Sequence, residues 1–135
     1  MNPSEIATLG LAAYLVLVAL LLGSFINMAA DRLPRHESLV HPRSHCRSCG
    51  RVLNLVDLIP VAGYLVRGGR CASCRTAIGA SSPAVEALCG AAMVASVALL
   101  GPWWGAVAGF VAVGAIGVAG VSLGFRASMR ESRQG

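Results

Sequence analysis

Four cysteines arranged in two pairs are the residues whose spacing most directly predicts chemistry. The first C-x2-C pair is Cys46 and Cys49, and the second, Cys71 and Cys74, follows after 21 residues. Two residues between cysteines let both sulfurs bind one ion, and Gly50 suits the tight turn that follows such a pair. Four thiolates at about 2.3 Å from the ion form the closed, structural type of zinc site. The spacing therefore predicts one structural zinc ion held by all four cysteines.

Other uses of these thiols compete with zinc. Disulfide or redox chemistry is disfavoured in a reducing cytoplasm, where the charge distribution below places this segment. An iron–sulfur cluster could use the same four thiolates, and the sequence leaves that alternative open. We interpret His36, His41 and His45 as solvated loop residues, because four sulfur ligands are already available. Cys89 lies in an apolar run and is expected to be a packing residue.

Two uncharged stretches must hold the cysteine-containing segment in place. Residues 6–30 carry no charge over 25 positions, and about 20 residues suffice to cross the hydrocarbon core. Residues 87–125 form a second uncharged run of 39 positions, which as one helix would be about twice as long as that core. A Gly-Pro pair at 101–102 interrupts this run, and the two tryptophans after it are typical of an interfacial belt. The second run is therefore predicted to be a hairpin: one span from about Pro83 to Leu100, a tight turn at residues 101–104, and a further span from Gly105 to Phe125.

Composition agrees with this architecture and excludes others. Apolar residues make up 56% of the 135 positions and charged residues 13%. A soluble domain of this size buries only about two thirds of its surface, so it could not hide so much apolar area. The same numbers exclude disorder. The predicted fold class is an all-α integral membrane protein with three transmembrane helices and a cytoplasmic, zinc-ribbon-like four-cysteine loop.

Four segments are expected along the chain. Residues 1–30 form a stub and the first transmembrane helix, and residues 31–82 form the metal-binding loop. Residues 83–125 form the transmembrane hairpin, and residues 126–135 form a basic tail. Glycines spaced four residues apart in the hairpin permit close helix approach; they are Gly105, Gly109, Gly120 and Gly124.

The charges predict how these segments lie across the membrane. Segment 31–82 holds eight arginines against three acids, net +5, and the tail is net +2, whereas the stub carries only Glu5. The positive-inside rule then places the N-terminus outside and the basic segments in the cytoplasm. The basic balance is explained by topology, so the expected partner is the lipid bilayer and not nucleic acid.

A few residues outside the cysteine pairs are candidates for a functional surface. Glu86 stands at the start of the second span, where an acid either snorkels to water or makes a functional polar contact. Arg32, Arg43 and Arg70 are candidates for shaping a substrate or partner face, although arginines beside a membrane also act as topology anchors. The apolar stretch 55–66 is too short and broken to span; it can cover the metal module or lie on the membrane surface.

The order of these features resembles the amino-terminal domain of the prepilin leader peptidase/N-methyltransferase family. In that family a first transmembrane helix ends in G-S-F-x-N followed by R-L-P, two C-x2-C pairs come next, and V-E-x-x-x-G opens the following helix. The resemblance covers roughly residues 20–92. The matching residues are Gly23, Ser24, Phe25, Asn27, Arg32, Leu33, Pro34, Pro42, Arg43, Ser44, Cys46, Cys49, Ile59, Pro60, Tyr64, Gly69, Arg70, Cys71, Cys74, Pro83, Val85, Glu86 and Gly90.

The resemblance implies a multi-pass protein of the bacterial inner membrane. Family members cut the leader from type IV prepilins and type II secretion pseudopilins and then methylate the new amino terminus. Their cleavage uses two aspartates beyond the amino-terminal domain, one of them in a G-x-G-D motif. The aspartates of this chain, Asp31 and Asp57, lie in no such motif. Cleavage by paired carboxylates needs two acids sharing a proton, so we expect no catalytic residues and no peptidase activity from this chain alone.

Three functional hypotheses follow from the resemblance. The first is a zinc module that acts on prepilins beside a separately encoded peptidase half. The second is a role in methylation, for which S-adenosylmethionine enters by resemblance alone, because no nucleotide-binding glycine loop is visible. The third is a non-enzymatic zinc-loop membrane scaffold or a degenerate relic.

Overall fold

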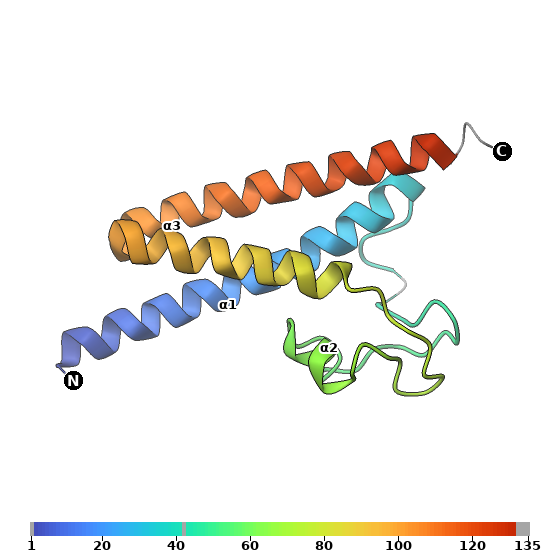
Figure 1. The fold of residues 1–135 in the computed structure, drawn as a ribbon, viewed down its shortest axis with the longest axis horizontal. Helices are drawn as coiled ribbons and strands as arrows, with labels where there is room; N and C mark the ends of the chain where they lie inside the picture. Colours follow the sequence, from blue (N-terminus) through green and yellow to red (C-terminus); the bar gives the residue numbers. More distant parts are fainter. Residues whose placement is uncertain (1, 42, 132–135) are drawn as a thin grey trace.

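The computed structural model describes residues 2–41 and 43–131, and the described chain is mostly helical (Figure 1). Its elements in order are α1 (Pro3–Arg32), the 3-10 turn η1 (Leu33–Arg35), α2 (Ala62–Val66) and α3 (Ser81–Glu131). The described residues form no strand; only two isolated bridges occur, both in the loop that joins η1 to α3. This loop, residues 36–80, is called the cysteine loop below.

Helix α1 starts at a capping box. The backbone N–H of Asn2 donates to the Glu5 carboxylate at 2.8 Å, and Pro3 takes the first helical position, where its missing N–H is not needed. The helix then runs for 30 residues, about 45 Å at roughly 1.5 Å per residue. Both α1 and α3 are long and apolar enough to cross a membrane.

Helix α3 reverses direction at one residue. Gly101 has φ 77° and ψ 175°, a conformation that residues with a side chain rarely adopt. Pro102 follows, and the helix continues through Trp103 and Trp104. The break is therefore confined to Gly101, and is shorter than the four-residue turn expected from the sequence. Figure 1 shows the two arms, residues 81–100 and 102–131, lying side by side.

Glycines let the two arms of α3 approach closely. A Cβ added at Gly105 would lie 2.5 Å from the Val97 Cα, so only glycine fits there. At Gly109, an added Cβ would meet the Met93 sulfur. The spacing predicted as a packing face therefore does lie in a helix interface. Gly124 in the second arm sits against the Ala30 carbonyl of α1 in the same way.

The core lies where α1 crosses the first arm of α3. Gly23 allows this crossing, because an added Cβ would lie 2.8 Å from the Glu86 Cα. The buried residues around it are Leu15, Ala19, Cys89, Met93 and Val113. Cys89 is fully buried in this cluster, as expected for a packing residue.

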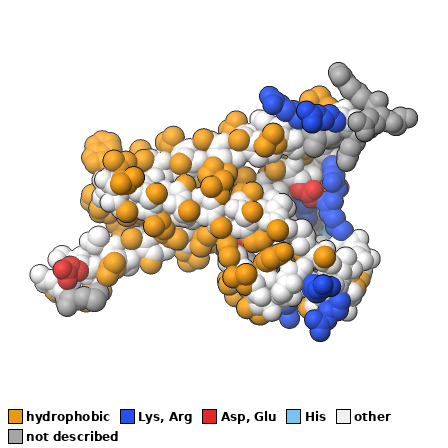
Figure 2. Space-filling model, in the orientation of Figure 1, with side chains coloured by type: hydrophobic (Ala, Val, Ile, Leu, Met, Phe, Trp, Pro, Cys, Tyr) orange, Lys and Arg blue, Asp and Glu red, His pale blue; other side chains and the backbone are white. Residues whose placement is uncertain are grey.

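The outside of the helices is apolar. Figure 2 shows hydrophobic side chains covering the helices, whereas the arginines gather toward one end and over the cysteine loop. Trp103, at 79% exposed, and Leu99, at 82%, stand beside the Gly101 turn at the opposite end. Helices with such surfaces face lipid and not water, so the chain is a membrane protein.

Candidate metal centre and adjoining cavity

The first cysteine pair forms a compact turn in the cysteine loop. The Cys46 N–H donates to the Arg51 carbonyl at 2.8 Å, and the Gly50 N–H donates back to the Cys46 carbonyl at 2.8 Å. Gly50 has φ 72°, the left-handed conformation that glycine adopts without strain. This turn brings Cys46 and Cys49 to the same side of the loop.

The second pair repeats this turn. The Cys71 N–H donates to the Thr76 carbonyl at 3.0 Å, and the Arg75 N–H donates to the Cys71 carbonyl at 3.1 Å. Arg75 has φ 60°, so an arginine here adopts the conformation that Gly50 adopts in the first turn. Two similar turns thus face each other across the cysteine loop.

The four sulfurs form a cluster with the dimensions of a metal site. The Cys46 and Cys74 sulfurs lie 3.7 Å apart, and those of Cys49 and Cys71 lie 3.9 Å apart. All four lie within 4.8 Å of one another. A tetrahedron with metal–sulfur bonds of about 2.3 Å has edges of about 3.8 Å, whereas a disulfide bond is about 2.05 Å long. The four cysteines are therefore free thiols placed to hold a metal ion.

Histidines take no part in this cluster among the described residues. Each of His36, His41 and His45 is exposed. The His45 Nδ1 lies 2.9 Å from the Arg43 carbonyl oxygen, a hydrogen bond within the preceding loop. The described cluster is thus made of sulfur alone, the ligand set expected from the sequence.

Three thiols of the cluster differ in their pKa values. The Thr76 hydroxyl and backbone lower the pKa of Cys74 to about 6. Backbone N–H groups of Cys74 and Ser73 lower the pKa of Cys71. The Arg51 N–H lowers the pKa of Cys49, but the neighbouring thiols, Cys74 foremost, and desolvation together raise it to about 11. The cluster therefore already holds a thiolate at neutral pH, which is the form that binds metals.

An ion triad between the two cysteine turns braces the loop. The Asp57 side chain is 7% exposed, and its carboxylate accepts hydrogen bonds from Arg51 at 2.8 Å and Arg67 at 2.7 Å. Burial raises the pKa of Asp57, but the Asn54 N–H and both guanidinium groups outweigh burial and lower it. Sequence reasoning missed this role; the spacing of Asn54 and Asp57, which hydrogen-bond each other's backbone N–H, is the signal that was available.

A second buried carboxylate ties the cysteine loop to α3. Glu86 is 5% exposed and accepts hydrogen bonds from the Val61 N–H at 2.6 Å and from the Ser82 hydroxyl at 2.9 Å. Val61 has φ 58° and ψ −52°, which is strained for a β-branched residue. The stretch 55–66 therefore packs against the first turns of α3, with α2 inside it.

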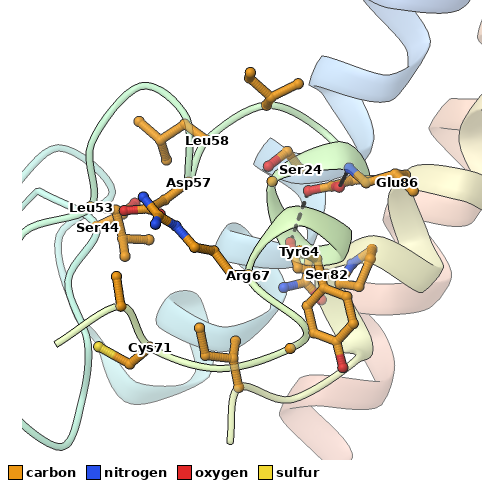
Figure 3. Close-up of a pocket in the computed structure, with 18 of the residues that line it drawn as sticks. Ser24, Ser44, Leu53, Asp57, Leu58, Tyr64, Arg67, Cys71, Ser82 and Glu86 are labelled. Carbon is orange, nitrogen blue, oxygen red and sulfur yellow. Dashed lines mark hydrogen bonds and ion pairs between the residues drawn. The ribbon is translucent and has the colours of Figure 1, made fainter. Parts of the chain in front are cut away.

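A cavity of about 220 Å³ lies between α1, α3 and the cysteine loop (Figure 3). Figure 3 shows Glu86, Ser24 and Ser82 on the helix side, and Asp57, Arg67 and Cys71 on the loop side. Of the four residues predicted for a functional face, Glu86 and Arg70 line this cavity. Arg32 and Arg43 line a separate hollow of about 190 Å³, and Arg32 donates to the Ser38 carbonyl at 2.8 Å. The structure therefore places the four residues around two hollows.

Comparison with known proteins confirms the family resemblance that the sequence motifs indicated. A family described as the bacterial peptidase A24 N-terminal domain matches residues 17–100, which include all four clustered cysteines and Glu86. A prepilin leader peptidase/N-methyltransferase of Burkholderia pseudomallei (strain K96243) is 34% identical over 123 residues, covering 73% of this chain and 40% of the relative. No solved structure matches the chain significantly.

Two further relatives carry the same name. The Myxococcus xanthus (strain DK1622) protein is 39% identical over 79 residues, which cover 58% of this chain and 24% of the relative. The Bacillus subtilis (strain 168) protein is 42% identical over 72 residues, which cover 53% of this chain and 29% of the relative. This chain thus matches 24–40% of the length of these three curated relatives.

Proposed function

The chain belongs to the family of bacterial peptidase A24 N-terminal domains, and we propose on this premise that it acts in prepilin or pseudopilin processing. It acts as a metal-holding module in the bacterial inner membrane, together with a peptidase half that supplies the catalytic carboxylates. The observation that carries the proposal is that the family match over residues 17–100 includes the complete four-sulfur cluster. The names of the relatives supply prepilins as the substrate class.

Zinc is the ion that we propose for the cluster. Four thiolates whose sulfur–sulfur distances suit a tetrahedron fit a closed structural zinc site, in which no position is left open for substrate. When bound, the ion would hold the two turns of the cysteine loop together. Residues Cys46, Cys49, Cys71 and Cys74 would be its ligands, and the Asp57 triad would hold the polypeptide around them.

We further propose that the chain does not cleave prepilins by itself. Cleavage by paired carboxylates needs two acids sharing a proton around one water molecule. Asp57 is committed to Arg51 and Arg67, and Asp31 forms ion pairs with Arg35 and Arg47. Both aspartates therefore have structural partners, which supports a role that depends on carboxylates from outside residues 1–135.

A chimaera tests the proposal. This chain would replace the matching region of the Burkholderia pseudomallei relative, and cleavage of a model prepilin would be measured in membranes. We expect the chimaera to cleave, the isolated chain to be inactive, and Cys71→Ser to reduce cleavage at least 10-fold together with zinc content. Cys89→Ser is the matched control, because Cys89 packs in the helix core, and both activity and zinc should persist.

Two outcomes would contradict the proposal. Cleavage by the isolated chain that is abolished by Asp57→Asn would make it a peptidase in its own right. A chimaera that folds and holds zinc but cleaves nothing would favour the scaffold hypothesis. Zinc content is measured on the same preparations, so a misfolded chimaera is recognised as such.

A further inference from the structure

Two buried carboxylates, Asp57 and Glu86, line the same cavity, and only Asp57 has positively charged partners among the described residues. Asp57 is paired with two guanidinium groups, from Arg51 and Arg67. Among the described residues, Glu86 accepts hydrogen bonds from the Val61 N–H and the Ser82 hydroxyl alone, and both donors are neutral. Within residues 2–41 and 43–131, no basic nitrogen lies within 4.0 Å of the Glu86 carboxylate. A buried carboxylate without a positively charged neighbour is stabilised when a cation binds beside it.

The arginines around the cavity are engaged elsewhere. Arg51 and Arg67 are held on Asp57, and Arg70 donates to the Arg75 carbonyl at 3.4 Å. Neutralising Glu86 with one of them would break an ion pair at Asp57 or a turn contact beside the sulfur cluster. The part of the chain that the structure describes therefore supplies no counter-ion to Glu86.

The Glu86 carboxylate is fixed in orientation by two elements. Ser82, one turn earlier on α3, holds one oxygen, and the Val61 N–H holds the other. Val61 is the centre of a strained γ-turn, in which the Ala62 N–H donates to the Pro60 carbonyl at 2.5 Å. Such strain persists only where the surroundings enforce it, and it is concentrated at ligand-binding sites. Each carboxylate oxygen keeps a further lone pair for another donor.

The remaining cavity wall suits a small organic cation. Ser24 and Asn27 lie three residues apart on one face of α1 and offer oxygen acceptors for N–H groups. Tyr64, from α2, adds an aromatic ring, which attracts cations. A volume of about 220 Å³ is below the roughly 300–1,000 Å³ of typical small-molecule pockets. The cavity can therefore hold a chemical group about as large as one amino-acid residue.

We propose that this cavity binds a primary ammonium group carried on a small apolar body. Glu86 is its counter-ion, and Ser24, Asn27 and Tyr64 complete the site. The headgroup of an ethanolamine lipid and a free amine of residue size both offer this chemistry. The inference stands on the cavity and does not depend on the role in prepilin processing.

Binding of leucinamide tests the site directly. The full chain, with its zinc, is placed in nanodiscs of phosphatidylcholine and phosphatidylglycerol, which contain no primary amine, and binding is followed by saturation-transfer NMR. We expect leucinamide to bind and N-acetyl-leucinamide, which lacks the charge, to bind at least 10-fold more weakly. In a second arm, phosphatidylethanolamine is added to the discs. Displacement of leucinamide identifies the lipid headgroup as the occupant, and undiminished binding identifies a free amine.

Substitutions separate the site from the fold. Glu86→Gln keeps the size and one acceptor oxygen, and should weaken leucinamide binding at least 10-fold. Glu37→Gln, at an exposed acid outside this cavity, should leave binding unchanged. Zinc content and thermal unfolding report whether each variant is folded, and Asn27→Leu provides a second test if Glu86→Gln unfolds. Equal binding by the wild-type chain and a folded Glu86→Gln variant, or no binding by the wild-type chain, would overturn the proposal.

Discussion

Position 75 holds an arginine in the backbone conformation that position 50 fills with glycine. The two turns are otherwise alike, and no side chain or backbone atom lies within 4 Å of the place that a Gly50 Cβ would take. A residue with a side chain costs about 1 kcal/mol or more in the left-handed region. Arg75→Gly should therefore stabilise the cysteine loop by about 1 kcal/mol, and Gly50→Ala should destabilise it by a similar amount.

Competition with a zinc chelator measures both changes. The zinc-loaded Arg75→Gly variant should resist the chelator about fivefold better than wild type, and Gly50→Ala should resist it about fivefold less. Arg75→Ala serves as the control, because it removes the side chain and keeps the strained backbone; it should behave like the wild-type chain. If Arg75→Ala and Arg75→Gly gave the same gain, the guanidinium group and not the backbone would be responsible.

Proton release reports how the sulfurs share charge before metal arrives. The pKa of Cys74 is about 6 and that of Cys49 about 11, so at pH 7 the first is ionised and the second protonated. Zinc binding at pH 7 should release fewer than four protons, and affinity should fall as pH falls, most steeply once Cys74 gains its proton below about pH 6. Calorimetry in buffers of different ionisation enthalpy counts the protons. Release of all four would contradict the lowered pKa of Cys74.

At the scale of the elements, one glycine decides how closely α1 and α3 pack. A Cβ at Gly23 would lie 2.8 Å from the Glu86 Cα, whereas one at Gly10 on the same helix would meet nothing within 4 Å. Gly23→Ala should destabilise the helix pair by about 1–3 kcal/mol through overpacking. Gly10→Ala is the matched control and should stabilise the helix by up to about 1 kcal/mol.

Thermal unfolding in detergent distinguishes the two glycines. The expected signs are opposite, so a general effect of alanine on helix propensity would not mimic the result. Gly23→Ala should also weaken contacts at the base of the cavity, because Glu86 lies on the facing turn of α3. An equal gain in stability for both variants would show that α1 and α3 do not approach as closely as the structure has them.

Features set by local sequence patterns could be predicted from the sequence, and features set by contacts between distant residues could not. Two long apolar helices and the meeting of four cysteines are confirmed, because hydropathy and C-x2-C spacing are local patterns. The Asp57 triad, the strained turn at Val61 and the hydrogen bond from Val61 to Glu86 were missed. The hydrogen bond joins the cysteine loop to α3, and the triad joins side chains across an irregular loop, so no hydropathy period encodes either of them. The turn at Val61 is a backbone conformation that side-chain pattern alone does not specify. The turn at Gly101 was predicted in place but not in length, because one left-handed residue suffices to reverse the chain.

On the scale of the whole molecule, the arginines and the N-terminus lie at opposite ends of the apolar helices. Figure 1 shows the N-terminus and the Gly101 turn at one end, and the close of α1 near the C-terminal part of α3 at the other. Segments 31–82 and 126–135 carry net charges of +5 and +2, and the stub carries −1. We propose three membrane crossings with the basic segments in the cytoplasm, because the positive-inside rule favours this distribution of charge.

Reporter fusions test that topology. A phosphatase that is active only when exported should be inactive when fused after Gly135 and active when inserted at the Gly101 turn, and a cytoplasmic fluorescent reporter should give the reverse pattern. The physical reason is the cost of moving seven net positive charges outward against the positive-inside bias. Replacing Arg126, Arg130 and Arg133 with serine leaves the +5 of segment 31–82 in place, so the orientation should persist. An active phosphatase after Gly135 in the unmodified chain would contradict the proposed topology and would place the four-sulfur cluster on the outer face, where its thiols would be oxidised to disulfides.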